Sequence, residues 1–143
     1  MKTIIILISF LYLIEITYCA ISFKDIATSL CLEASANRGI FSNECNIKNA
    51  FQKWILNPSE SATINGQIFK DLKNVVSGLC LEGDVKSKQI NIVECNNNDS
   101  QKWTINNQEV KNALGLCLES DADNKVFLND CLRTTFQKWT NNE

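Results

Sequence analysis

The sequence predicts an all-β fold made of three copies of one unit. Three observations support this prediction. The triplet Gln-Lys-Trp occurs three times and contains all three tryptophans of the chain. A Cys-Leu-Glu triplet precedes each copy, and a second cysteine follows its first cysteine by 14, 15 and 14 residues. Apolar residues alternate with other residues just before each second cysteine, which is typical of short, half-buried strands.

The amino-terminal segment, residues 1–19, predicts a secretory signal peptide. An apolar run from Ile4 to Ile14 is too short to span a bilayer but suits the core of such a peptide. Small side chains at the −3 and −1 positions favour cleavage before Ala20. A retained membrane anchor is the alternative. We therefore expect a secreted, extracellular mature chain of residues 20–143, with no stable membrane insertion.

Composition excludes several classes of function. The net charge is −2 and no basic cluster is present, which argues against nucleic acid as a partner. The chain has no histidine and no Cys-x-x-Cys spacing, so we expect neither a metal site nor a cofactor. General-base or nucleophile chemistry would fall to scattered carboxylates, so we expect a protein that is not an enzyme.

Cys19 leaves with the signal peptide, and the mature chain then has six cysteines, which predicts three disulfides. Pairing between neighbouring units would close loops of unequal length, whereas pairing within each unit closes three nearly equal loops of about 15 residues. Each such loop is worth about 3 kcal/mol through restriction of the unfolded chain. The repeat therefore favours the pairs Cys31–Cys45, Cys80–Cys95 and Cys117–Cys131.

The short strands explain why the tryptophans recur in one triplet. In an extended strand the Gln and Trp side chains share one face and the Lys side chain points to the other. Three units that each bury little alone can combine their indoles in a common core, at about 2–3 kcal/mol each. A buried Gln amide needs backbone partners. The predicted structural core is Gln52, Trp54, Gln101, Trp103, Gln137 and Trp139.

Three Q-x-W motifs in register with paired cysteines resemble the ricin B-type (QxW) β-trefoil lectins. The Phe-Gln-Lys-Trp form is also similar to the cysteine-rich trefoil domain of mannose-receptor-type proteins. The resemblance covers residues 21–143 and implies twelve short strands in three lobes around a pseudo-threefold axis. The implied lobes are residues 21–66, 67–107 and 108–143, and the implied activity is carbohydrate binding.

Sugar-binding lobes of that family use an Asp two residues after the first cysteine, an aromatic two residues before the second, and an Asn before Q-x-W. No lobe of this chain has the full set. The acid position holds Glu33, Glu82 and Glu119; the aromatic position holds Asn43, Val93 and Asn129; the Asn position holds Phe51, Ser100 and Phe136.

Strand parity nevertheless places the same kinds of group outward in the first and third lobes. The predicted carbohydrate-binding residues are Glu33, Phe41, Asn43 and Phe51 in the first lobe, and Glu119, Phe127, Asn129 and Phe136 in the third. An aromatic face, a carboxylate and an amide are the parts of a shallow sugar site. Two alternatives are that Phe51 and Phe136 cover the disulfides and pack under a neighbouring loop, or that they form a protein-contact patch.

The second lobe is expected to be silent, because Asn91, Val93 and Ser100 occupy its outward positions. It also contains a glycosylation sequon, which predicts N-glycosylation at Asn98. A polar stretch rich in turn formers, Asn57 to Gln67, lengthens the first unit. This predicts a surface loop, which either carries specificity or is tolerated drift.

The sequence thus predicts a secreted carbohydrate-binding protein with degenerate, shallow sites, whose partners are glycans or glycoproteins. The alternative is a trefoil that has lost sugar binding and acts as a secreted effector on a protein receptor.

Overall fold

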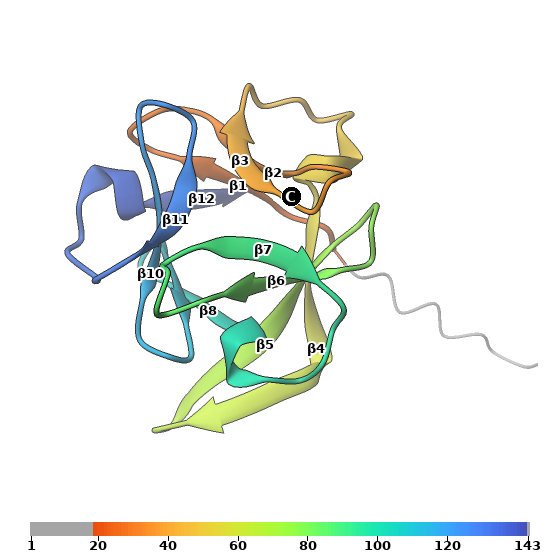
Figure 1. The fold of residues 1–143 in the computed structure, drawn as a ribbon, viewed down its shortest axis with the longest axis vertical. Coiled ribbons are helices and arrows are strands. Elements are labelled where there is room, and N and C mark those ends of the chain that lie inside the picture. The colour runs from red at the N-terminus through yellow and green to blue at the C-terminus, as the bar shows by residue number, and fades with distance from the viewer. Residues whose placement is uncertain (1–18, 143) are drawn as a thin grey trace, which may run out of the picture.

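The computed structural model describes residues 19–142, which form twelve strands and three 3-10 helices (Figure 1). The first four strands are β1 (Ser22–Asp25), β2 (Cys31–Ala34), β3 (Ile40–Asn43) and β4 (Trp54–Ile64). The next four are β5 (Gln67–Asn74), β6 (Cys80–Gly83), β7 (Ile90–Val93) and β8 (Lys102–Asn106). The last four are β9 (Glu109–Asn112), β10 (Cys117–Ser120), β11 (Val126–Asn129) and β12 (Trp139–Asn142). A 3-10 helix precedes the last strand of each lobe: η1 (Ala50–Gln52), η2 (Asp99–Gln101) and η3 (Thr135–Gln137).

Six strands close into a barrel in the order β1, β4, β5, β8, β9, β12 and back to β1. Antiparallel ladders join β4 to β5, β5 to β8, β8 to β9 and β12 to β1. The two remaining seams are shorter: Ile21 and Trp54 exchange backbone hydrogen bonds of 2.8 and 2.9 Å, and the Trp139 amide donates to the Gln108 carbonyl at 2.7 Å. Each tryptophan therefore lies where the last strand of a lobe meets the first.

The other six strands form three hairpins, β2–β3, β6–β7 and β10–β11, one from each lobe. Strands β3, β7 and β11 contact one another and come together near the middle of Figure 1. Six barrel strands and three capping hairpins, repeated in three lobes, make a β-trefoil. The predicted all-β class and the three-lobed architecture are confirmed.

One continuous core fills the barrel. Trp54, Trp103 and Trp139 are at most 1% exposed and belong to the same hydrophobic cluster. Each indole N–H donates to the backbone carbonyl of the leucine in its own lobe's Cys-Leu-Glu triplet, at 3.2, 2.8 and 3.0 Å. The large aromatic surface is thus buried without leaving its one polar group unpaired.

One disulfide clips each lobe, as the repeat predicts. Cys31 pairs with Cys45, Cys80 with Cys95 and Cys117 with Cys131. Each bridge connects the start of a hairpin to the loop after it, so it fixes the base of that hairpin. Cys19, the first described residue, is an exposed free thiol.

Two sequence-based expectations are wrong in detail. The Gln of each Q-x-W motif ends a 3-10 helix and does not lie in a strand, because its side-chain oxygen accepts loop amides and tightens the turn. The polar stretch of residues 57–67 is no loop, because β4 and β5 pair through it, with a register shift between Asn57 and Ser61.

Backbone conformation explains the long hairpin of β4 and β5. Asn65 and Gly66 have φ values of 50° and 77°, so both central residues of the two-residue turn are left-handed. An Asn-Gly pair favours that turn, whose twist matches paired strands. Turn chemistry at Asn65-Gly66 therefore outweighs the low strand propensity of the polar residues before it.

The predicted signal peptide, residues 1–19, lies outside the described residues except for Cys19. Across residues 19–142 no helix has the length and apolar character needed to cross a membrane.

Candidate functional site

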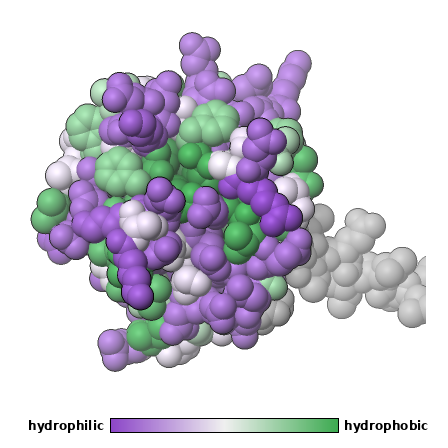
Figure 2. Space-filling model, in the orientation of Figure 1, coloured by the Kyte–Doolittle hydropathy of each residue, from purple (hydrophilic) through white to green (hydrophobic). Residues whose placement is uncertain are grey.

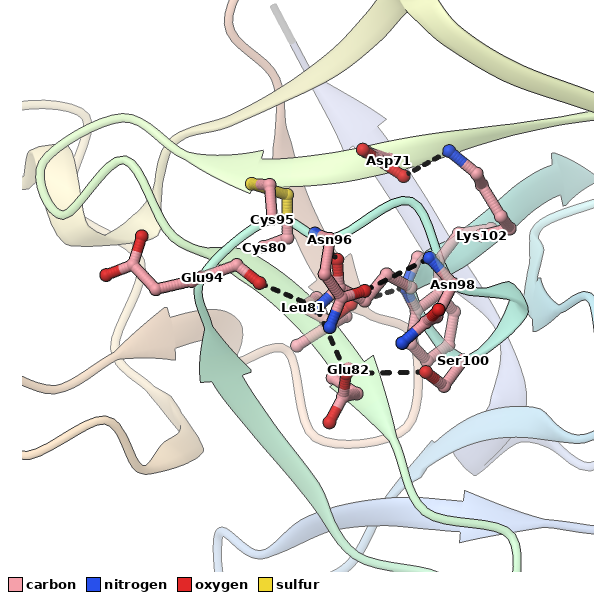
Figure 3. A network of polar contacts seen from close by, with 12 residues as sticks. Asp71, Cys80, Leu81, Glu82, Glu94, Cys95, Asn96, Asn98, Ser100 and Lys102 are labelled. Atoms are coloured by element: carbon pink, nitrogen blue, oxygen red, sulfur yellow. Dashed lines mark hydrogen bonds and ion pairs between the residues drawn. A yellow bond between two sulfur atoms is a disulfide. The ribbon is translucent and has the colours of Figure 1, made fainter.

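A buried Gln and a carboxylate form the same polar cluster in every lobe. Gln52 Nε2 donates to Glu33 Oε2 at 2.7 Å and to the Glu44 carbonyl at 2.8 Å, while its Oε1 accepts the Asn46 amide at 2.9 Å. In the second lobe Gln101 Nε2 donates to Glu82 Oε2 and to the Glu94 carbonyl, both at 3.0 Å. Figure 3 draws this network around the labelled Glu82 and Glu94. These clusters tie each hairpin to the 3-10 turn beside it.

The third lobe repeats the arrangement with shorter hydrogen bonds. Gln137 Nε2 donates to Glu119 Oε2 at 2.6 Å and to the Asp130 carbonyl at 2.7 Å. Its Oε1 accepts two amides, those of Leu132 at 2.8 Å and Arg133 at 3.0 Å. Backbone partners for the Gln were expected, but its carboxylate partner was not. The parallel recurrence of Cys-Leu-Glu and Gln-Lys-Trp is the sequence signal that could have shown it.

The same carboxylates face the outer side of the hairpins. Glu33 lies directly across from Phe41 in the β2–β3 ladder, and Glu119 lies across from Phe127 in the β10–β11 ladder. Directly opposed residues of an antiparallel pair share one face of the sheet. Each of these four side chains is half-buried. The structure therefore brings the predicted carboxylate and the predicted aromatic side by side in both lobes.

The third lobe adds an amide and a cation to this pair. Asn129 Nδ2 donates to Glu119 Oε2 at 3.1 Å, and Lys88 Nζ donates to Asn129 Oδ1 at 3.1 Å. Lys88 comes from the β6–β7 turn of the second lobe, and its carbonyl also accepts the Leu128 amide at 2.8 Å. Sequence reasoning missed Lys88, because nothing local relates it to Asn129, 41 positions away.

The first lobe has the same groups in a looser arrangement. Asn43 is exposed, and its Oδ1 accepts the adjacent Glu44 amide at 2.9 Å. A polar hollow of about 520 Å³ lies beside it, lined by Asn43 to Ile47 and Asn49. Glu33 and Asn43 are not hydrogen-bonded to each other, in contrast to their equivalents Glu119 and Asn129.

The second lobe presents different chemistry at these positions. Glu82 lies across from Asn91 instead of a phenylalanine, and Ser100 Oγ donates to Glu82 Oε2 at 3.3 Å (Figure 3). Without an aromatic face, this lobe offers no platform for the apolar side of a sugar ring. Asn98 is exposed and caps η2 without a side-chain hydrogen bond, so its amide is accessible to the predicted glycosylation.

Phe51 and Phe136 precede equivalent glutamines but differ in exposure. Phe51 is half-buried and packs against the hydrophobic core, whereas Phe136 is 38% exposed. Parity along a strand had placed both outward, but both residues lie in 3-10 helices, where the period-two rule does not hold. Of these two rings, that of Phe136 is therefore the more exposed to solvent.

The third-lobe cluster contains one carboxylate, at Glu119, and one ammonium group, at Lys88, so its formal charges cancel. No group of three or more potential metal ligands occurs in the part of the chain that the structure describes. The cluster can therefore donate and accept hydrogen bonds at a half-buried surface, and it has the features of a binding site.

The family model of the ricin-type beta-trefoil lectin domain matches residues 19–139. The chain belongs to this family. No curated protein sequence matches it. The ricin-type lectin domain is the fold that the Q-x-W resemblance implies, and that prediction is confirmed.

Solved structures share the fold at low sequence identity. A non-toxic homologue of type II RIPs from Momordica charantia (bitter gourd), solved with α-methyl-D-galactoside, is 20% identical with a TM-score of 0.70. The alignment covers 88% of this chain but 48% of that one, so this lectin domain spans about half the length of its neighbour. The Abrus precatorius agglutinin is 19% identical, with a TM-score of 0.70 and coverages of 87% and 46%.

A designed threefold-symmetric protein, ThreeFoil, shares this architecture. It is 13% identical with a TM-score of 0.69, and the alignment covers 87% of this chain and 98% of ThreeFoil. The fold of this ricin-type lectin domain is therefore complete within a single set of three lobes.

Proposed function

We propose that the protein is a secreted carbohydrate-binding protein with shallow sugar sites on its first and third lobes. One observation carries the proposal: Glu119, Asn129 and Gln137 form a hydrogen-bonded cluster beside Phe127 on the outer face of the third-lobe hairpin. Membership of a lectin family and the galactoside bound to the bitter gourd homologue support it.

Recognition would combine ring stacking with hydrogen bonds. The Phe127 ring supplies an apolar surface for the C–H groups of a pyranose. Within residues 19–142, Glu119 Oε2 is occupied by Gln137 and Asn129, while no protein group donates to Oε1. That oxygen is oriented by two bonds to its neighbour and can accept a sugar hydroxyl as a charge-assisted hydrogen bond.

The first-lobe site would be weaker. Its carboxylate is held by Gln52, but its Asn43 amide is exposed and must be ordered when a ligand binds. Ordering a side chain costs about 0.5–1.5 kcal/mol. Open sites also leave much of the ligand solvated, so each lobe alone should bind modestly, and multivalent glycans should gain from avidity.

A binding role fits the groups available better than a catalytic one. The sequence has no histidine, and the six cysteines after Cys19 all lie in disulfides. Each carboxylate of the three clusters sits in its own lobe against a Gln amide. We accordingly propose that the protein is a lectin without catalytic activity.

A glycan array probed with the oxidised protein tests the proposal. Glu119→Gln and Phe127→Ala should each weaken binding to the preferred glycan at least about tenfold, because each removes one contact worth about 1.4 kcal/mol or more. Glu82→Gln is the matched control in the second lobe and should leave binding unchanged. Absence of any retained glycan at high protein concentration would reject the lectin function.

Secretion is proposed on separate grounds. Three disulfides in a small domain are typical of oxidising compartments. Expression of the full chain in a eukaryotic secretory host should release protein that begins at Ala20. Edman sequencing or intact mass would show this, and a cell-retained product that still begins at Met1 would favour the membrane anchor.

A sugar-inactive effector that binds a protein receptor is the second candidate. It is favoured by the apolar side chains on the loops that follow the second cysteines: Ile47 is 86% exposed and Leu132 is 66% exposed. If this is the function, Ile47→Ser and Leu132→Ser should abolish receptor binding, whereas free sugar should not compete with it.

A further inference from the structure

A hollow of about 490 Å³ lies on the pseudo-threefold axis, where the three hairpins converge. Each hairpin contributes the start of its second strand: residues 39–41, 89–91 and 123–127. Figure 2 shows hydrophobic atoms gathered in this part of the surface, surrounded by hydrophilic side chains. We call this feature the axial hollow. Its volume lies within the range of small-molecule sites.

The walls of the axial hollow are held by a cyclic set of hydrogen bonds. The Ser42 amide donates to the Asn124 carbonyl at 3.0 Å, and the Ile92 amide donates to the Arg38 carbonyl at 3.2 Å. The Leu128 amide completes the ring by donating to the Lys88 carbonyl at 2.8 Å. Each hairpin therefore fixes the next one, and the hollow exists before any ligand arrives.

The lining of the axial hollow is apolar at its base and rich in amides toward its opening. Ile40, Ile90 and Val126 occupy equivalent positions and form the floor, where they continue the hydrophobic core. Phe41 and Phe127 line two sides, and Asn91 takes the equivalent place on the third. A ring can thus stack on phenylalanine and contact aliphatic carbons beneath it, while one edge faces an amide.

The charged residues of the lining indicate which class of ligand the axial hollow can bind. The only charged residues of the lining are Asp123 and Lys125, which are exposed and of opposite sign. No single charge is therefore favoured, and three amides remain: Gln89, Asn91 and Asn124.

We infer that the axial hollow binds a small, uncharged ligand with a planar ring and an amide or hydroxyl on one edge. The hollow shares Phe41 and Phe127 with the proposed glycan sites, but the inference goes beyond those sites, since Glu119, Asn129 and Lys88 take no part in the lining. A phenyl ring buried against apolar side chains provides the main attraction, and the amides orient the polar edge.

Acetanilide, which is a phenyl ring carrying one neutral amide, is a suitable probe. Titration of ¹⁵N-labelled protein should give saturable shifts of the amides of Phe41, Asn91 and Phe127, with a Kd of about 1 mM for so small a ligand. Contacts between ring protons and the methyl groups of Ile40, Ile90 and Val126 should appear in the same sample. Benzoate and benzylammonium should bind at least about tenfold more weakly, because their charge must be desolvated and the two exposed charges of the lining, Asp123 and Lys125, are of opposite sign.

Two variants and two controls complete the test. Phe41→Ala and Phe127→Ala should each weaken acetanilide binding at least about tenfold, through loss of a stacking face. Phe136→Ala removes a phenylalanine outside the hollow, and Glu119→Gln disables the proposed sugar site; both should leave acetanilide binding within about twofold.

The outcomes separate this inference from the proposed function. Acetanilide binding that survives Glu119→Gln supports the axial site whether or not the protein binds any glycan. Absence of saturable shifts in the wild-type protein, or shifts confined to residues outside the hollow, would overturn it. Equal binding of benzoate would overturn the requirement for a neutral ligand.

Discussion

The second and third lobes have the same internal contacts and different surfaces. In both, the tryptophan is buried and donates to a leucine carbonyl, and the preceding glutamine joins a glutamate to the loop after the second cysteine. On the outside, Glu119 faces Phe127, whereas Glu82 faces Asn91. Lobes with the same internal contacts can thus differ in the side chains that they offer for binding.

The lysines of the two Gln-Lys-Trp triplets show a second difference. Lys102 is buried, and its Nζ lies 2.8 Å from Asp71 Oδ1. Lys138, its equivalent in the third lobe, is only half-buried. Asp71 lies across from Lys102 in the β5–β8 ladder, which places a carboxylate beside the second triplet. The same residue of a repeated motif can therefore contribute differently to the free energy of unfolding in different lobes.

The largest expected effect tests the shared scaffold. Trp103→Ala and Trp139→Ala should each lower the free energy of unfolding by about 3–5 kcal/mol, because each leaves a cavity and an unpaired leucine carbonyl. Urea denaturation of the oxidised protein measures both. A cost below about 1 kcal/mol in only one lobe would show that the lobes do not share a common core.

The second-largest expected effect concerns the buried ion pair of the second lobe. Lys102→Met should cost about 3 kcal/mol, because Asp71 loses the cation that compensates its buried charge. Lys138→Met should change stability by less than about 0.5 kcal/mol. Denaturation midpoints give both values. Asp71→Leu combined with Lys102→Met should restore most of the loss, and failure to do so would mean that the lysine acts through packing alone.

Replacing the glutamine of the second or the third lobe should have similar effects on stability and different effects on glycan binding. Gln101→Ala and Gln137→Ala should each cost about 1–3 kcal/mol, since loop amides and a carboxylate lose their partner. Only Gln137→Ala should also weaken glycan binding, because it releases Glu119 from its orientation. Thermal unfolding and glycan binding are measured on the same samples. Equal loss of glycan binding in both variants would contradict the assignment of the site to the third lobe.

The smallest effect concerns the hairpin turn of the second lobe. Backbone hydrogen bonds from Lys86 and Ser87 hold the pKa of Asp84 below its ordinary value. Because the folded pKa is the lower one, the resulting stabilisation is present above the ordinary Asp pKa and is lost as pH falls through the folded pKa. Asp84→Asn should therefore lower stability slightly at neutral pH, where the stabilisation is fully present, and its difference from the wild-type protein should shrink as pH falls through the acidic range. Urea midpoints measured from neutral to acidic pH would show this, and a difference that grows as pH falls would be inconsistent with it.

Local patterns were sufficient where the determining contacts repeat in the sequence. Alternating apolar residues, the cysteine spacing and the Gln-Lys-Trp triplets predicted the strands, the disulfides and the core residues, because each pattern recurs within every lobe. The pairing of Glu33 with Phe41 could be predicted for the same reason. The prediction of a loop at residues 57–67 was wrong because it rested on the composition of the whole stretch. The hairpin turn depends on two residues, Asn65 and Gly66, whose effect composition alone does not show.

Contacts between lobes could not be predicted in this way. Lys88 reaches Asn129 from another hairpin, and the axial hollow requires three segments that are distant in the sequence. Phe51 and Phe136 are both followed by Gln-Lys-Trp but differ in burial, since Phe51 packs against the hydrophobic core and Phe136 does not.

The amino-acid sequence by itself determined the three-lobed β architecture, the disulfides and the burial of the glutamines against backbone partners, because these depend on short-range spacing within each repeat. Only the tertiary structure decided which lobe has a connected polar cluster, which lysine is buried and where an axial hollow opens. Those features depend on how one lobe packs against another, and the distances involved are not encoded in any single repeat.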